Sequence, residues 1–255
     1  MEQQLPYPTA YTVEDFAQRL ALVKTRMAAA AQRAGRTVAD VRLLPVSKTV
    51  DSARMRHAIA VGCKDLGENK VQEALRKSRE LADIPGLRWH VIGHLQSNKA
   101  KLVAEFAHEF QALDRLSVAT ALNNRLATAG RVLEVLVQVN TSGEDSKFGL
   151  PPEEVGAFLK ELPAFEHLRI KGFMTLAIHS ADDARVRACF QSLHSVREQW
   201  RSMAPSGVDL SELSMGMSGD FELAIEEGST VVRVGQAIFG ARALPDSYYW
   251  PAPGA

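Results

Sequence analysis

The sequence predicts a single parallel (β/α)8 TIM barrel of the α/β class, preceded by an N-terminal helix. About eight short apolar runs suited to strands alternate with amphipathic helical stretches, and no strand-only block, linker or low-complexity stretch divides the chain. Its 255 residues match the usual size of such a barrel. An open doubly wound sheet shows the same alternation, but the G-x-G-x-x-G turn typical of its first strand is missing. We therefore expect one domain over 1–255, with the barrel at 41–242 and a flexible tail at 243–255.

The first element is an amphipathic helix at 12–35. Thr12 is a candidate N-cap and Gly35 a candidate C-cap. Apolar residues recur at helical spacing between them and predict one buried face, made of Phe16, Leu20, Val23, Met27 and Ala30.

The period of the apolar residues then switches repeatedly between strand-like and helical. The strand candidates are 41–47, 63–68, 88–94, 109–114, 132–140, 168–177, 210–216 and 230–235. Helical patterns between them include 52–62, 69–82, 151–163 and 182–204.

Composition excludes several classes of function. Thirty basic and thirty acidic residues give a formal net charge of zero, which provides no global field for nucleic acid or an anionic membrane. The two cysteines, Cys63 and Cys189, have no spacing typical of a disulfide framework or a zinc site. The N-terminus resembles no signal peptide, and no segment is apolar for long enough to span a bilayer. We expect a soluble cytoplasmic protein.

Barrel proteins build their sites at the carboxyl ends of the strands. Polar residues and glycines gather at these ends in the predicted barrel: Lys48, Glu68 with Asn69, Gly93 with His94, Asn140, Met174, Ser214 to Gly216, and Gly235.

Lys48 ends the first predicted strand, where alternation with Leu44 and Val46 would point it into the barrel mouth. Desolvation there would lower its pKa and leave a neutral amine able to form a Schiff base. The alternative is a lysine beyond the strand end whose ammonium reaches water.

The stretch "LSMGMSGDFELAIEEG" joins the seventh strand to a helix. Its backbone N–H groups and the Ser218 hydroxyl would form an anion-binding nest, and Gly235 after the eighth strand would let a ligand approach the backbone. Phosphate sites in barrels typically use these two loops. Ordinary capping by Ser218 and a turn at Gly235 are the alternatives.

Arg233 lies between valines in the eighth strand and must be paired or hydrogen-bonded. It could donate to a ring nitrogen or a phosphate, or form a salt bridge inside the barrel. A lysine for an aldehyde, a nest for phosphate and an arginine for a ring acceptor together describe a pocket for pyridoxal 5′-phosphate (PLP).

Seven motifs resemble one family in its order: "PVSKT" at 45–49, "GENKVQEA" at 67–74, "WHVIGHLQSNK" at 89–99, "VNTSGEDSKFG" at 139–149, "KGFMT" at 171–175, "LSMGMSGDFELAI" at 213–225 and "STVVRVGQAIFGAR" at 229–242. They look like the pyridoxal-phosphate homeostasis proteins, whose barrel is similar to the N-terminal domain of alanine racemase.

This resemblance implies Lys48 as the covalent aldimine lysine and Arg233 facing the pyridine nitrogen. Asn69 and Met174 would line the cofactor, with Ser214 and Met215 in the same pocket. Ser218, Gly235 and Gln236 would hold the phosphate. Gln236 departs from the small hydroxyl residue usual in the family, so a backbone contact to phosphate survives there and a hydroxyl contact is not supported.

Other candidate sites are less consistent with the pattern. His90 and His94 would lie about 13 Å apart on a strand, too far to share a metal ion, so we expect them in the core or pocket wall. "GMSGD" lacks the final glycine of a hydrolase G-x-S-x-G elbow. Lys147 could accept the aldehyde transiently or be a solvated loop lysine.

Two functions share this pocket. A racemase of this barrel type needs a second base, and the tyrosines near the end of the chain, Tyr248 and Tyr249, lie in a Pro-rich tail. An arginine at the ring nitrogen also weakens the ring as an electron sink. We therefore expect a monomeric carrier that buffers PLP and supplies apo PLP-dependent enzymes; a single-domain PLP-dependent racemase is the alternative. A Schiff-base aldolase would not explain Arg233.

Overall fold

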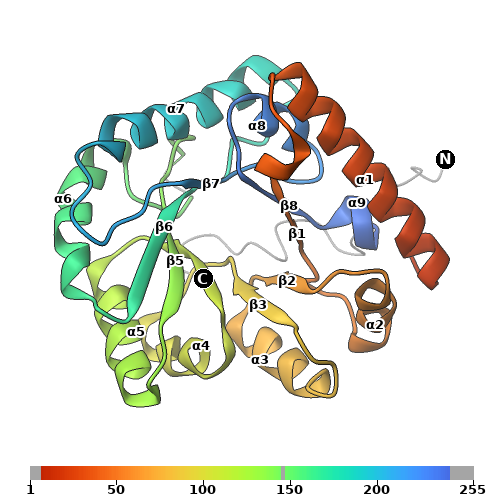
Figure 1. The fold of residues 1–255 in the computed structure, drawn as a ribbon, viewed down its shortest axis with the longest axis horizontal. Helices are drawn as coiled ribbons and strands as arrows, with labels where there is room; N and C mark the ends of the chain where they lie inside the picture. The colour runs from red at the N-terminus through yellow and green to blue at the C-terminus, as the bar shows by residue number, and fades with distance from the viewer. Residues whose placement is uncertain (1–6, 145–146, 242–255) are drawn as a thin grey trace.

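The computed structural model describes residues 7–144 and 147–241, and these form an eight-stranded parallel barrel surrounded by helices (Figure 1). The strands are β1 Arg42–Pro45, β2 Asp65–Glu68, β3 Arg88–Val91, β4 Glu109–Leu113, β5 Leu133–Gln138, β6 Leu168–Met174, β7 Glu212–Ser214 and β8 Val231–Val234. The helices are α1 Val13–Arg33, α2 Ser52–Ala60, α3 Val71–Glu80, α4 Ala100–Phe106, α5 Leu116–Ala129, α6 Val155–Glu161, α7 Asp183–Arg201, α8 Phe221–Glu226 and α9 Gln236–Phe239. All eight predicted strands are present, and the predicted fold class is confirmed.

The strand order is β1-β8-β7-β6-β5-β4-β3-β2, with every pair parallel. The two ends of this sheet meet just beyond β1, where Val46 forms a parallel bridge with Gly67. There the Ser47 N–H donates to the Gly67 carbonyl at 3.0 Å. This contact closes the barrel and brings the loop after β1 next to β2.

Helix α1 has the predicted buried face, because Phe16, Leu20, Val23, Met27 and Ala30 are all buried. Thr12 and Asp15 form a capping box at its start. The helix ends at Arg33 with Ala34 as its C-cap, one residue before the predicted Gly35. Gly35 follows in the left-handed region with φ 67°, where a glycine after the cap is favoured. The helix packs against α8 and α9.

The apolar core lies mainly between the strands and the surrounding helices. One cluster joins β3–β7 to α4–α7, and a second joins β1, β2 and β8 to α1, α2, α8 and α9. Inside the barrel a small cluster of Leu44, Val46, Ile92 and Val231 leaves room for polar side chains. Cys63 and Cys189 are both buried free thiols.

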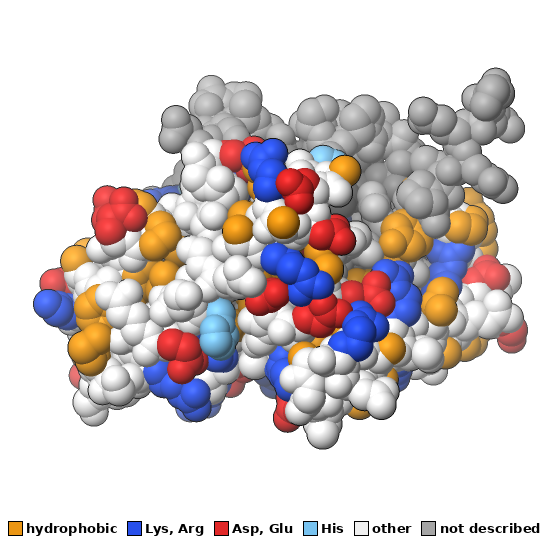
Figure 2. All heavy atoms as spheres, turned by 90° about the horizontal axis from the view of Figure 1, so that it is seen from above, with side chains coloured by type: hydrophobic (Ala, Val, Ile, Leu, Met, Phe, Trp, Pro, Cys, Tyr) orange, Lys and Arg blue, Asp and Glu red, His pale blue; other side chains and the backbone are white. Residues whose placement is uncertain are grey.

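On the face shown in Figure 2, acidic and basic side chains are interspersed, so the part of the surface in this view has no single-sign field. Within the described ranges, no helix is long and apolar enough to cross a membrane. The proposed tail at 243–255, with Tyr248 and Tyr249, lies outside the described residues.

Candidate cofactor-binding site

Lys48 lies in a tight turn after β1. The strand ends at Pro45, and the Val50 N–H donates to the Ser47 carbonyl at 3.0 Å, which closes a turn around Lys48. The expectation that strand alternation directs Lys48 into the mouth is therefore wrong, because a turn and not a strand sets its direction. Lys48 is nevertheless half-buried and lines a cavity of about 260 Å³.

The loop between β8 and α9 forms the opposite wall of this cavity, with Gly235 and Gln236 among its lining residues. A Cβ atom at Gly235 would lie 3.2 Å from the Val46 carbonyl oxygen, so the absence of a side chain keeps the two loops close. Gln236 is the first residue of α9, and its N–H has no intrahelical acceptor. The lysine and two of the predicted phosphate residues thus face one cavity.

Arg54 also lines this cavity, and the sequence analysis missed it. Its guanidinium donates to the Ala10 carbonyl at 2.9 Å and the Phe239 carbonyl at 2.6 Å, which ties the segment before α1 to α9. Thr9 and Tyr11 of that segment complete the wall. Arg54 belongs to an amphipathic helix pattern, so no local signal separated it from surface arginines.

Ser218 joins the two loops that were predicted to bind phosphate. Its Oγ accepts hydrogen bonds from the N–H groups of Gly235 and Ala237, both at 3.2 Å. Because this oxygen accepts twice, its own proton remains available to donate to a ligand. The N-cap of α8 is Asp220 and not Ser218.

The start of α8 provides fewer free donors than we expected. The N–H groups of Asp220 and Phe221 both donate to the Met217 carbonyl, and the Met217 N–H donates to the Asp220 carboxylate at 2.5 Å. Local turns therefore use these donors. In the loop after β8 the N–H groups of Gly235 and Ala237 donate to Ser218 Oγ, which leaves the Gln236 N–H and the Ser218 proton as the candidate donors to an anion.

Arg233 is 3% exposed, and it is hydrogen-bonded to uncharged groups. Its Nη1 donates to Ser214 Oγ at 2.7 Å and its Nη2 to the Thr175 carbonyl at 2.8 Å. No carboxylate lies within ion-pair distance of it in the described part of the chain, so the salt bridge considered above does not form. Burial lowers the pKa of Arg233 to about 10.

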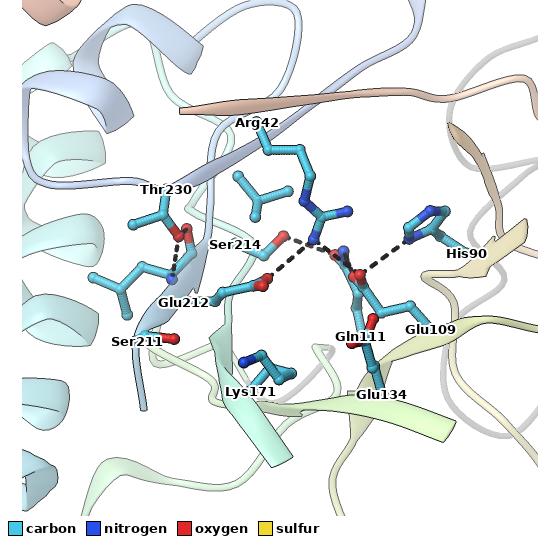
Figure 3. A network of polar contacts seen from close by, with 12 residues as sticks. Arg42, His90, Glu109, Gln111, Glu134, Lys171, Ser211, Glu212, Ser214 and Thr230 are labelled. Carbon is cyan, nitrogen blue, oxygen red and sulfur yellow. Dashed lines mark hydrogen bonds and ion pairs between the residues drawn. The ribbon is translucent and has the colours of Figure 1, made fainter. Parts of the chain in front are cut away.

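Ser214 connects Arg233 to a polar network inside the barrel. Figure 3 shows this network from Ser214 through Gln111 and Glu109 to Arg42 and His90. Ser214 donates to Gln111 Oε1 at 2.7 Å, and Gln111 in turn donates to Glu109. Glu109 Oε2 lies 2.9 Å from Arg42 and 3.1 Å from His90 Nδ1. In the series Arg233–Ser214–Gln111–Glu109, each residue therefore donates a hydrogen bond to the next, and the series ends at the Glu109 carboxylate.

Glu109 is the last residue of this hydrogen-bonded series, and its charge state is set by its neighbours. Burial alone would raise the pKa of Glu109, but the hydrogen bond and charge of His90 and the charge of Arg42 outweigh it and lower this pKa to about 2. Glu109 is thus ionised at neutral pH. His90 also contacts Asp65 at 2.8 Å and is buried, as its predicted core position requires.

Asn69 follows β2 and carries two buried polar atoms without a partner. Neither Oδ1 nor Nδ2 has a hydrogen-bond partner among the described residues. Gly93 lies against it: a Cβ on Gly93 would come within 2.3 Å of the Asn69 carbonyl oxygen. A buried amide left unpaired is costly, so this side chain fits a ligand contact.

Met174 and Met215 are fully buried at the ends of the neighbouring strands β6 and β7. The described lining of the cavity beside Lys48 does not include Asn69, Met174, Ser214, Met215, Ser218 or Arg233. The structure thus brings together Lys48, Gly235 and Gln236 directly, Ser218 through hydrogen bonds to the cavity wall, and Arg233 with Ser214 as a separate bonded pair.

Lys147 and His94 also have defined neighbours. The Lys147 ammonium donates to the Ala177 carbonyl at 2.8 Å and pairs with Glu144, so Lys147 is half-buried in its own loop. His94 stacks on Phe148 with ring centroids 3.7 Å apart. No group of three metal-ligating side chains occurs over residues 7–144 and 147–241.

These residues fit a small anionic aldehyde with an aromatic ring. The cavity offers the Lys48 amine and the backbone of Gly235 and Gln236. The Ser218 hydroxyl lies behind that backbone, and a buried unpaired amide and a buried guanidinium stand outside the cavity lining. The fold and site define a barrel of the alanine racemase N-terminal class, and that domain family matches residues 19–243.

Comparison with known proteins gives the narrower family. The chain is 43% identical over 226 residues to the pyridoxal phosphate homeostasis protein of Pseudomonas aeruginosa, covering 89% of this chain and 95% of that protein. It belongs to the pyridoxal phosphate homeostasis protein family, as its motifs indicated.

Solved structures agree with this assignment. PipY of Synechococcus elongatus with PLP bound superposes with a TM-score of 0.78 at 34% identity, covering 88% of this chain and all of PipY. Alanine racemase from Bacillus anthracis superposes with a TM-score of 0.69 at 15% identity, covering 98% of this chain and 62% of the racemase, which supports the shared fold alone.

Proposed function

We propose that this single barrel binds PLP covalently at Lys48 and buffers or delivers the cofactor, without robust catalysis of its own. The observation that carries the proposal is that Lys48 and the Gly235–Gln236 backbone line the same cavity. The family's members are named for pyridoxal phosphate homeostasis, and PipY was solved with PLP bound.

Each part of the site has a role in this proposal. The backbone at Gly235 and Gln236 and the Ser218 hydroxyl hold the phosphate, and Asn69, Met174, Ser214 and Met215 surround the ring. Condensation of the Lys48 amine with the cofactor's aldehyde forms one C=N bond and releases one water, so no oxidant or reductant is needed.

Arg233 favours a carrier over a racemase. A charged guanidinium directed at the ring nitrogen disfavours protonation of that nitrogen and so weakens the ring as an electron sink. The hydrogen bonds from Arg233 to Ser214 and Thr175 leave its charge uncompensated by a paired carboxylate. We further propose that the protein acts as a monomer in the cytoplasm and that apo PLP-dependent enzymes are its recipients.

The test combines a visible spectrum, borohydride reduction and peptide mass mapping of the purified protein, before and after incubation with amino acids. We expect a yellow protein modified at Lys48 and inert toward amino acids. Lys48→Ala should abolish the reducible adduct, and adduct retained elsewhere in that variant would contradict the assignment. Labelling at Lys48 with amino-acid turnover would instead establish the racemase alternative.

A further inference from the structure

The turn that carries Lys48 is held on both sides of the lysine by side chains from β2 and α3. Before the lysine, Ser47 Oγ donates to Glu68 Oε1 at 2.6 Å, and the Ser47 carbonyl accepts from Lys77 Nζ at 2.9 Å. After the lysine, the Thr49 N–H donates to Glu73 Oε1 at 3.0 Å. Both neighbours of Lys48 are therefore fixed by polar contacts.

The three side chains that make these contacts form one cluster. Lys77 Nζ lies 2.8 Å from Glu68 Oε1 and 2.7 Å from Glu73 Oε1. With the Ser47 carbonyl, these oxygens provide three acceptors for the three ammonium protons, so the cluster has one well-defined geometry. We call Lys77, Glu68 and Glu73 the turn-anchoring cluster.

The cluster is buried where charges are costly. The side chains of Lys77 and Glu68 are fully buried, and burial raises the pKa of Glu68 against the opposing effect of Lys77. A buried ion pair commonly stabilises a fold no better than an apolar cluster of the same size. Stability alone therefore gives little reason to place these charges beneath this loop.

The turn that this cluster holds has an unfavourable backbone conformation at Thr49. Thr49 has φ 68°, and it is the one non-glycine residue with positive φ among those described. In the hydrogen-bonded turn from Ser47 to Val50, Lys48 is the second residue and Thr49 the third, which is the position where a type II turn requires positive φ. A β-branched residue rarely adopts this conformation unless its surroundings impose it.

We propose that the turn-anchoring cluster is a positioning device for Lys48, with Glu73 holding Thr49 in the left-handed conformation that directs the lysine into the cavity. This inference rests on the proposed role of Lys48. The alternative is a purely structural role, in which the cluster only joins α3 to β2. Lys48 would then react with PLP equally well after the Thr49–Glu73 hydrogen bond is lost.

The first experiment measures the rate at which PLP and borohydride label Lys48, read by peptide mass mapping. Glu73→Ala removes the acceptor of the Thr49 N–H and should slow labelling about tenfold. Glu73→Gln keeps an oxygen at this position and should label faster than Glu73→Ala. Adding Thr49→Gly to Glu73→Ala should restore the rate to within about threefold of the parent, because glycine adopts positive φ freely. Glu105→Gln changes an exposed carboxylate of α4 that pairs with Arg79 and is the matched control.

Restoration of the labelling rate by Thr49→Gly distinguishes a positioning role from a purely structural one. Glycine allows the positive φ of the turn, but it does not replace the lost carboxylate of the turn-anchoring cluster. Labelling of Glu73→Ala at the parental rate, or no restoration by Thr49→Gly, overturns the positioning role while the proposed function stands. A parent protein that takes no label at Lys48 overturns the proposed function, and the positioning role with it.

A second measurement needs neither PLP nor a variant. Thr49 is an exposed residue, yet its N–H is bonded to Glu73, so hydrogen exchange in the unloaded parent should be slowed about 100-fold relative to an open loop. Rapid exchange of the Thr49 amide would overturn the inference even if Glu73→Ala failed to fold.

Discussion

Arg233 and Ser214 are joined by a 2.7 Å hydrogen bond in which the guanidinium is the donor and the serine oxygen the acceptor. Ser214 must accept, because its own proton is donated to Gln111. The Ser214 hydroxyl thus orients the buried Arg233 guanidinium by accepting from it, and it links this cation to Gln111 inside the barrel by donating.

This relationship predicts the effect of Ser214→Ala. The substitution removes the acceptor of Arg233 Nη1 and the donor to Gln111 Oε1, both buried, so we expect the free energy of unfolding to fall by about 1–3 kcal/mol. Urea denaturation measures the change. Ser211→Ala, three residues earlier and exposed just before β7, should change stability by less than about 0.5 kcal/mol. Equal effects of the two substitutions would show that the Ser214 link is energetically unimportant.

Ser218→Ala should have a mild effect on cofactor retention. It removes the oxygen that braces the Gly235 and Ala237 N–H groups, but those donors remain and can still face a phosphate. We expect PLP to dissociate a few-fold faster, equivalent to about 1 kcal/mol. Dilution followed by absorbance measures the rate, with the exposed Ser206→Ala as control. Complete loss of binding would mean that the hydroxyl is the principal phosphate donor.

Gly93→Ala should disturb the site through Asn69. The new Cβ would lie 2.3 Å from the Asn69 carbonyl oxygen, and the backbone there cannot move away cheaply. We expect a loss of about 1–3 kcal/mol in stability together with weaker PLP binding, measured by thermal unfolding and equilibrium dialysis. Gly219→Ala is the matched control, since no heavy atom outside its two chain neighbours lies within 4 Å of its Cβ position among the described residues. Unchanged PLP binding in Gly93→Ala would argue against a ligand contact by Asn69.

Acid stability should depend on Glu109. Its pKa falls from 4.5 to about 2 in the folded protein, so its contribution is fully present above pH 4.5 and is lost as the pH falls toward 2. The full contribution is on the order of 3 kcal/mol. Glu109→Gln should be less stable than the parent at pH 7, and this gap in the free energy of unfolding should narrow below pH 4.5. A gap that is constant with pH would contradict the depressed pKa, and Glu105→Gln again provides the control.

Local sequence patterns were sufficient to predict the strands and helices and to identify single residues with unusual chemistry. The alternation of apolar periods predicted all eight strands, and the buried face of α1 followed from helical spacing alone. Lys48 and Arg233 were identifiable because a charged side chain beside an apolar strand requires an explanation wherever it occurs. The motifs around them were long enough to indicate the family before any contact was known.

The partners of these residues could not be read from the sequence. Arg233 is bonded to Ser214 and Thr175 and not to an acid, and Ser214 meets Gln111, 103 positions earlier in the chain. The strand pattern also placed Lys48 on a strand face, whereas it lies in a turn with Thr49 at φ 68°. Neither a strained backbone angle nor a contact between distant strands produces a periodic pattern in the sequence, so neither could be predicted from it.

The sequence by itself therefore determined the barrel, its N-terminal helix and the lysine on which the proposed chemistry depends, because hydrophobic periodicity and side-chain chemistry are local properties. Only the tertiary structure decided that Lys77 and Glu73 of α3 lie beneath the Lys48 turn, and that Gly235 faces Lys48 across one cavity. The physical reason is pairing between strands: the bridge from Val46 to Gly67 closes the barrel and brings the Lys48 turn beside β2 and α3. The parallel pairing of β1 with β8, in which Pro45 lies opposite Val234, brings Gly235 to the same turn.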